Sequence, residues 1–323
     1  TNSYFFFFKH LIYVLIGISL IFIFSSLNSD QLYKYSIILF FVSLISLFLV
    51  PFIGVEVKGS KRWIDLFFLP RFQPIEVLKP FLIIILATIL CDIKSNILFK
   101  YLISIFLISF ISLLLIAQPD IGQTLLVIFC WAVLIFTSGI NIYILLAIFI
   151  AGASLLTYLI IYVPRFDYIQ GRIFSFFNRE TGTHNFQSDK AIESITSGGF
   201  FGKGIGEGVL KNRVPEAHTD YIISVISEEF GVVAIMLILL LFLILIYMVF
   251  KKISFETNDK VKLILIGSIS LILMQATIHV GVNIRLFPTT GMTLPFLSYG
   301  GSSIISTSIL GGIILNLTKR KIT

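Results

Sequence analysis

Residues 187–231 read QSDKAIESITSGGFFGKGIGEGVLKNRVPEAHTDYIISVISEEFG and form the longest polar interval of a chain that is otherwise mostly apolar. Six glycines lie between positions 198 and 208, and the polar run PEAHTD follows and ends at Asp220. An apolar segment begins at once and carries Glu228 and Glu229 in its opening turns. Ionisable side chains at the end of a membrane helix are costly to keep there, so this interval predicts a functional site.

Composition is typical of a polytopic membrane protein. Of the 323 residues, 57% are hydrophobic and 13% are charged, whereas a soluble domain carries roughly a quarter charged residues. The net charge of +7 is not gathered into a basic run, so we expect no nucleic-acid partner and favour an anionic lipid surface or substrate. Cys91 and Cys130 lie in apolar segments and predict packing, not a disulfide or metal framework.

Nine apolar runs predict spanning helices, because one crossing needs about 20 residues. The runs are 11–27, 36–53, 75–91, 101–117, 121–137, 141–163, 221–250, 261–282 and 302–317. They predict an all-α multi-helix bundle in one integral-membrane domain, 1–323, with a large extracytoplasmic loop, 164–220, between the sixth and seventh helices.

The linkers between these runs fall into two alternating groups. The first comprises 28–35, 92–100, 138–141, 251–262 and 318–323; the second comprises 54–74, 118–120, 164–220 and 283–301, together with the N-terminus. Counted over short loops, where the positive-inside bias is reliable, the first group is the more basic and is predicted to be cytoplasmic. Binding of an anionic substrate would explain the cations left in the long outer loops.

Two of the outer loops are more than linkers. Residues 54–80 place five cations around Trp63: Lys58, Lys61, Arg62, Arg71 and Lys79. Residues 281–303 mix prolines and glycines into a largely apolar segment. Irregular backbone near membrane depth survives only where it is buried in protein or lines a cavity, so both loops are predicted to cover a shared outer-face cleft.

Five segments along essentially the whole chain resemble one family. They are GSKRWIDL with RFQPIEVLK, AQPDIGQTLL, the glycine-rich run through PEAHTD to EEFG, GVNIRLFPTTGMTLPFLSYGGSS, and the basic tail. The chain is thereby similar to the SEDS family of bacterial wall-building membrane proteins, and to its division (FtsW) branch more than to its elongation (RodA) branch. Ile75 departs from the small residue that the family often has there. Since the family usually has ten helices, we expect the first to be missing.

The resemblance implies a peptidoglycan glycosyltransferase that polymerises lipid II, an undecaprenyl-pyrophosphate-linked disaccharide pentapeptide. It would act by inverting hexosyl transfer at the outer face of the cytoplasmic (inner) membrane, at the division septum. The implied partners are a class B penicillin-binding protein (an FtsI-like transpeptidase) and other division proteins. No cofactor is certain, and a divalent cation, Mg²⁺ or Mn²⁺, is left open.

The reaction needs a base for the acceptor hydroxyl and positive charge for the departing pyrophosphate. Asp220 matches the family's catalytic aspartate; the alternative is that Thr219 or Asp220 only caps the helix that starts near Tyr221. His218 either carries a second proton or orients the loop. The glycines from 198 to 208 are predicted to form a flexible lid.

The resemblance assigns phosphate binding to Arg71 and Lys79, which we expect to converge with Asp220. The alternatives are an interfacial anchor for Arg71 and a snorkelling side chain for Lys79. Glu76 either holds Lys79, coordinates a divalent ion, or is an ordinary first-turn acid. Trp63 is either part of an interfacial aromatic belt or a sugar-stacking platform.

Three other groups of residues have two interpretations each. Ser298, Gly300 and Gly301 allow close backbone approach to a lipid head group, or only form a tight turn. Asp120 is expected to cap the following helix, and a role in substrate binding is the second interpretation. Glu228 and Glu229 are expected to form a structural pair more readily than a proton relay.

Three rival functions remain. A lipid flippase would line its path with polar groups on both sides of the midplane, whereas helices 36–53, 101–117 and 141–163 carry no charge. The distribution favours an outer-face enzyme. A non-catalytic scaffold and an elongation-type polymerase stay open.

Overall fold

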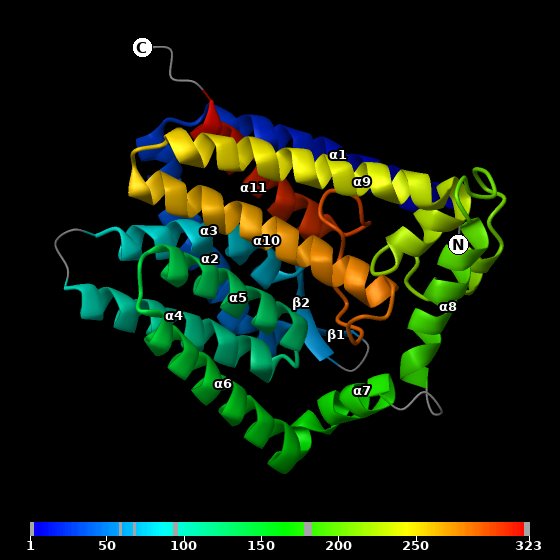
Figure 1. Cartoon of the computed structure of the whole chain (residues 1–323), viewed down its shortest axis with the longest axis horizontal. Helices are drawn as coiled ribbons and strands as arrows, with labels where there is room; N and C mark the ends of the chain where they lie inside the picture. Colours follow the sequence, from blue (N-terminus) through cyan, green and yellow to red (C-terminus); the bar gives the residue numbers. More distant parts are fainter. Residues whose placement is uncertain (1–2, 58–59, 67–68, 93–95, 178–182, 320–323) are drawn as a thin grey trace. The chain divides into compact units, whose positions relative to one another are not determined.

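The computed structural model describes residues 3–57, 60–66, 69–92, 96–177 and 183–319, and is mostly helical (Figure 1). The helices are α1 (Ser3–Ser26), α2 (Ser29–Ile53), α3 (Pro74–Leu90), α4 (Ile97–Ala117), α5 (Ile121–Thr137), α6 (Ile142–Tyr162), α7 (Asp167–Phe177), α8 (Thr183–Gly198), α9 (Ile222–Phe255), α10 (Asp259–Asn283) and α11 (Gly301–Thr318). Two short 3₁₀ helices, η1 (Pro164–Phe166) and η2 (Leu210–Arg213), complete them.

Each of the nine apolar runs corresponds to one of these helices. In the described part of the chain, seven helices are long and apolar enough to cross a membrane: α1, α2, α4, α6, α9, α10 and α11. The other two, α3 and α5, have 17 residues each. The helical membrane-protein class is therefore confirmed, while a count of nine spanning helices stays a prediction.

The first of the loops predicted to be outer contains a small antiparallel sheet, so the all-α prediction was wrong there. Strands β1 (Val55–Val57), β2 (Ser60–Leu66) and β3 (Leu69–Phe72) pair in the order β1-β2-β3. Trp63 lies opposite Val55, and Ile64 lies opposite Phe72. Such β-branched and aromatic cross-strand pairs stabilise short strands, and the charges between them had made the segment look like an irregular linker.

The large outer loop is also partly helical, since α7 and α8 lie between residues 164 and 220. The predicted boundaries of the loop agree with the end of α6 at Tyr162 and the start of α9 at Ile222.

The chain forms two compact units. Unit one comprises residues 1–139, 246–273 and 295–323, and unit two comprises residues 140–245 and 274–294. In unit one, α1 packs along α11, and α3 packs against α2, α5 and α11. Most of α3 is buried, so it forms the centre of this unit. In unit two, Ile223, Ala276 and Leu294 form the core where α9, α10 and the following loop meet.

Contacts within unit one agree with the two predicted groups of linkers. At one end, Lys319 donates to the carbonyl of Ser25 (2.8 Å) and Lys260 lies 3.7 Å from the centroid of the Tyr33 ring. Among the outer linkers, Arg62 donates to the carbonyl of Gln118 (3.1 Å). Linkers assigned to the same side thus meet each other, which the alternation of spanning helices requires.

Candidate functional site

The main chain of Asp220 is held from two directions in unit two. Its N–H donates to the carbonyl of Glu216 (3.1 Å), and its carbonyl accepts from Nδ2 of Asn283 (3.0 Å). Asp220 is half-buried and lies two residues before α9 begins at Ile222. A Cβ placed on Gly291 would lie 3.7 Å from its Oδ2, so that glycine borders the carboxylate. The carboxylate is therefore carried on a fixed backbone.

Asn283 and His279 support this position and were missed by sequence reasoning. Asn283 is fully buried at the last residue of α10, and its Nδ2 also donates to the carbonyl of His279 (2.8 Å). Nδ1 of His279 is hydrogen-bonded to the carbonyl of Met292 (2.8 Å). A histidine inside the apolar run 261–282 and an asparagine directly after it were the available signal. They join the end of α10 to Asp220 and to the loop after α10.

His218 and Thr219 lie in the turn before Asp220. His218 is exposed. The hydroxyl of Thr219 donates to the carbonyl and to the carboxylate of Glu216, at 3.2 and 3.1 Å. The role of Asp220 as a base stays a prediction.

Glu228 is a structural acid, as predicted. It is fully buried in α9, where Oε1 accepts from the N–H of Leu210 (2.9 Å) and Oε2 accepts from the hydroxyl of Ser194 (3.0 Å). The ammonium of Lys203 lies 3.5 Å from Oε1. Its neighbour Glu229 accepts from the N–H of Gly206 (3.2 Å). Both acids hold the segment that precedes the PEAHTD motif.

The glycine-rich segment is hydrogen-bonded to a kink in α9, and its role as a flexible lid stays a prediction. At Gly231 the backbone leaves the helical region (φ 77°, ψ 179°), which frees peptide groups on both sides of the kink. The carbonyls of Glu228 and Glu229 accept from the N–H groups of residues 203 and 204, at 2.9 and 3.0 Å. The N–H of Val232 donates to the carbonyl of Gly199 (3.0 Å).

Replacing Gly198 by alanine is expected to destabilise unit two by about 1–3 kcal/mol, the usual cost of overpacking. A Cβ there would lie 1.9 Å from the carbonyl oxygen of Ser227, so one of the two backbones must shift. Thermal unfolding of the purified protein measures the effect. Gly152→Ala in α6 is the matched control, because its Cβ meets nothing within 4 Å. Equal melting temperatures for the two variants would contradict the packing role.

In unit one, Glu76 and Lys79 form a buried ion pair. The side chains are 5% and 1% exposed, and Nζ of Lys79 lies 2.9 Å from Oε2 of Glu76. Gln123 of α5 joins them: its Oε1 accepts from Lys79 (3.1 Å) and its Nε2 donates to Glu76 (2.6 Å). Of the alternatives for Glu76, the one in which it holds Lys79 is confirmed. A snorkelling role for Lys79 was wrong, because the lysine lies in the interior.

Asp120 caps α5, as predicted, and forms a second buried cluster. Its Oδ1 accepts from the N–H of Gln123 (3.4 Å), and its Oδ2 accepts from Nε2 of Gln73 (2.9 Å). Nη1 of Arg62 lies 3.7 Å from Oδ1, and Arg62 also donates to the carbonyl of Pro119. Burial raises the pKa of Asp120, and the charge of Arg62 opposes that rise. Arg62 thus connects strand β2 to the start of α5.

Arg71 is an exposed cation on β3, with 58% of its side chain accessible. Its Nε donates to Oδ2 of Asp65 (2.8 Å), which is itself 41% exposed. Trp63 is half-buried on β2. Lys58 lies outside the described residues. Arg71 is therefore the accessible member of the predicted phosphate-binding pair, and Lys79 is the buried one.

The SYGGSS segment starts α11. Ser298 is buried and Gly300 occupies the position before the helix. A Cβ on Gly301 would lie 2.4 Å from the ring of Tyr13, so the close approach at Gly301 is to a side chain of α1. Contact of Ser298, Gly300 or Gly301 with a lipid head group stays a prediction.

The candidate residues are divided between the two units. Arg71, Glu76 and Lys79 belong to unit one, and Asp220 and His218 belong to unit two. The convergence of Asp220 with the two cations stays a prediction. Across the described residues, no three His, Cys, Asp or Glu side chains are grouped so as to hold a metal ion; the divalent cation also stays a prediction.

Comparison with known proteins gives consistent similarities. The family described as "Cell cycle protein" (FTSW_RODA_SPOVE) matches residues 1–322. Proteins named "Probable peptidoglycan glycosyltransferase FtsW" are similar: that of Caulobacter vibrioides is 34% identical (84% of this chain, 69% of the relative), and that of Coxiella burnetii is 33% identical (97% and 86%).

Two solved structures extend the similarity to the fold. A chain of the structure described as "Structural coordination of polymerization and crosslinking by a peptidoglycan synthase complex" aligns with a TM-score of 0.81 at 27% identity, covering 97% of this chain and 89% of that one. The rod shape determining protein RodA of Thermus thermophilus aligns with a TM-score of 0.70 at 28% identity, covering 96% and 86%.

Proposed function

Because the chain belongs to the FtsW/RodA/SpoVE family of cell cycle proteins, we propose that it is a peptidoglycan glycosyltransferase that polymerises lipid II into glycan strands. The observation that carries the proposal is the 33% identity, over 97% of this chain, to a protein named as a probable peptidoglycan glycosyltransferase. The proposed place of action is the outer face of the cytoplasmic membrane, during septal wall synthesis.

In the proposed reaction, the acceptor sugar hydroxyl attacks the anomeric carbon of the donor sugar. The new C–O bond forms as the C–O bond to pyrophosphate breaks, and the pyrophosphate leaves with the electron pair. The hydroxyl proton passes to the carboxylate of Asp220, acting as general base. The hydrogen bond from Asn283 to the main-chain carbonyl of Asp220 supports this role. It positions the backbone of Asp220 through the main chain and does not involve the carboxylate.

Arg71 and Lys79 are proposed to stabilise the departing pyrophosphate. Arg71 is suited to direct contact, since it is exposed and an arginine forks onto phosphate with two parallel hydrogen bonds. Lys79 is proposed to supply its positive charge from below the protein surface, where its ammonium is paired with the carboxylate of Glu76. His218, Trp63 and the SYGGSS residues are proposed to contact the substrate around this centre.

The proposed partner is a class B penicillin-binding protein that cross-links the new strand, acting with other division proteins. The support is the structural similarity to a chain from a complex described as coordinating polymerization and crosslinking.

The deciding experiment is polymerisation by purified components. The full chain, alone and with its class B partner, is incubated with lipid II, and glycan strands are resolved by gel electrophoresis. We expect strands from the complex. If the folded complex makes no strands but moves lipid II across liposome membranes, the protein is a flippase and the proposal fails.

Arg71→Ala is expected to raise the lipid II concentration needed for half-maximal rate by roughly 10- to 100-fold, since a charged hydrogen bond is worth about 1.5–3 kcal/mol. Arg71→Lys should recover only part of this loss, because the bidentate fork is gone. Stability should change little, because the Asp65 pair is exposed. Lys61→Ala, an exposed cation of the same sheet, is the control. A wild-type titration curve for Arg71→Ala would remove the phosphate role.

The proposed orientation is testable with the native cysteines. Cys91 is half-buried at the end of α3, and Cys130 is buried. A membrane-impermeant maleimide should modify Cys91 in inverted vesicles and not in intact spheroplasts. In a Cys91→Ser background, Lys61→Cys should give the reverse pattern. The same pattern from both sites would contradict the assigned topology.

A further inference from the structure

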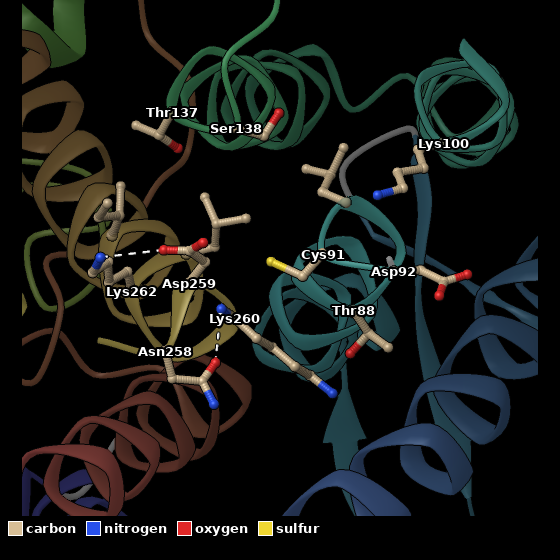
Figure 2. A pocket seen from close by; sticks show the side chains of 13 residues that line it. Thr88, Cys91, Asp92, Lys100, Thr137, Ser138, Asn258, Asp259, Lys260 and Lys262 are labelled. Atoms are coloured by element: carbon tan, nitrogen blue, oxygen red, sulfur yellow. Dashed lines mark hydrogen bonds and ion pairs between the residues drawn. The ribbon is translucent and has the colours of Figure 1, made fainter. Parts of the chain in front are cut away.

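Unit one contains a cavity that the proposed reaction does not use. Its volume is about 920 Å³, and it is partly open to the surface. It lies where the ends of α3 and α5 meet the starts of α4 and α10 (Figure 2). The lining residues are Thr88, Leu90, Cys91, Asp92, Lys100, Thr137, Ser138, Asn258, Asp259, Lys260, Lys262, Leu263 and Ile266. Ten of these are polar or charged, so the cavity suits a polar occupant.

Two of the cations that line the cavity carry no nearby counter-charge. Asp259 is matched by Lys262, whose ammonium lies 3.2 Å from its Oδ1. Among the described residues, Lys100 and Lys260 have no carboxylate within ion-pair distance. Lys260 lies over the ring of Tyr33 instead, at 3.7 Å from its centroid.

The orientation of the side chains keeps the charge of the cavity positive. Counting three lysines against Asp92 and Asp259 gives 3 − 2 = +1. Figure 2 shows the Lys100 ammonium directed toward the side where Cys91 lies, whereas the carboxylate of Asp92 is directed the other way. The Lys260 ammonium is directed to the other side of Cys91 (Figure 2), over the ring of Tyr33. An anion in the cavity near Lys100 would therefore gain one charge-assisted contact there, and the charge of Lys260 would add to the positive field of the cavity.

The surroundings favour an anion that carries acyl chains. Ile97, Leu98 and Phe99 open α4 immediately before Lys100, and they are 62%, 63% and 56% exposed. An apolar, exposed surface of a membrane helix is covered by lipid chains. Seven lining residues belong to linkers assigned to the cytoplasmic side, where anionic lipids attract basic residues: Asp92, Lys100, Ser138, Asn258, Asp259, Lys260 and Lys262.

We propose that this cavity binds the phosphate head group of an anionic phospholipid of the cytoplasmic leaflet. Lys100 contacts the phosphate, Lys260 adds positive charge from the other side of the cavity, and the acyl chains lie along the exposed start of α4. The site stabilises the ends of α3, α4, α5 and α10 against one another. It is independent of the polymerisation reaction, since its residues lie outside the proposed catalytic groups.

Cys91 provides a native reporter, because its thiol lies in the cavity wall and Cys130 is buried. The full chain is placed in nanodiscs of phosphatidylcholine alone or with about one-third phosphatidylglycerol. The anionic lipid gives the membrane surface a negative potential. The rate of modification of Cys91 by a neutral maleimide is measured. We expect a several-fold slower reaction in the nanodiscs that contain phosphatidylglycerol.

Lys100→Gln with Lys260→Gln should abolish this protection, and Lys251→Gln, an exposed lysine of α9 outside the cavity, should keep it. Because Lys100 and Lys260 also act on the Cys91 thiol directly, protection is taken as the ratio of the rates in the two lipid compositions within each variant. A change in thiol ionisation that is common to both compositions then cancels. Melting temperatures establish that each variant is folded.

A third arm adds inorganic phosphate to the phosphatidylcholine nanodiscs. Protection by phosphate equal to that by phosphatidylglycerol would assign the site to a soluble phosphate compound and overturn the lipid proposal. Equal rates in both lipid compositions, or protection that survives in the double variant, would overturn it as well.

Discussion

Asp220→Asn is expected to lower the rate of glycan polymerisation by about 10²- to 10⁴-fold, the contribution typical of a general base. Asparagine keeps the size of the side chain but cannot accept the acceptor hydroxyl's proton. The main-chain bonds of Asp220, to Glu216 and from Asn283, do not involve its carboxylate and should persist. We therefore expect a folded protein that still binds lipid II and its class B partner.

The measurement is initial rate of strand formation from lipid II at saturating substrate, together with co-purification of the partner. Glu207→Gln is the matched control, since it makes the same chemical change at an exposed acid of the preceding loop. Near-wild-type activity in Asp220→Asn would reject the base and leave helix capping as the role of Asp220. A loss of partner binding would place the defect in folding and not in chemistry.

The sequence predicted the positions of the helices well because a long apolar run is a strong signal. The run 121–137 is α5, residue for residue, and 75–91 differs from α3 by one residue at each end. The three-stranded sheet was missed because its strands are short and lie between charges. In such a segment, alternation over three to seven residues is too brief to separate a strand from a linker.

The site was predicted less completely because its contacts are remote in sequence. Residue type indicated that Glu76 and Lys79 could pair, since they are one turn apart. Their burial depends on Gln123, 44 residues after Lys79. The glycines from 198 to 208 suggested mobility, whereas their partner is a kink at Gly231 that frees backbone groups of α9. Neither Gln123 as the partner of Lys79 nor the Gly231 kink as the partner of the glycines can be predicted from the neighbouring residues in the sequence.

Lys79→Ala is expected to destabilise the protein by about 3–5 kcal/mol, because it leaves the buried carboxylate of Glu76 without its counter-charge. Gln123 alone cannot replace it, since the amide brings no charge. Thermal or denaturant unfolding of the purified protein measures the loss. Lys190→Ala is the matched control: Lys190 pairs with Glu193 at the same three-residue spacing, but the side chains are 24% and 50% exposed. That exposed pair should contribute no more than about 1 kcal/mol.

A double variant separates the structural role of Lys79 from its proposed role toward pyrophosphate. Lys79→Met with Glu76→Gln removes both charges and keeps much of the volume, so we expect most of the stability to return. Polymerisation should nevertheless stay impaired, since the positive charge for the leaving group is still absent. If the stable double variant uses lipid II as wild type does, Lys79 serves only to neutralise Glu76, and the pyrophosphate contact must be assigned to Arg71 and other cations. If the double variant is as unstable as Lys79→Ala, the cost arises from lost packing around α3 and not from the stranded carboxylate.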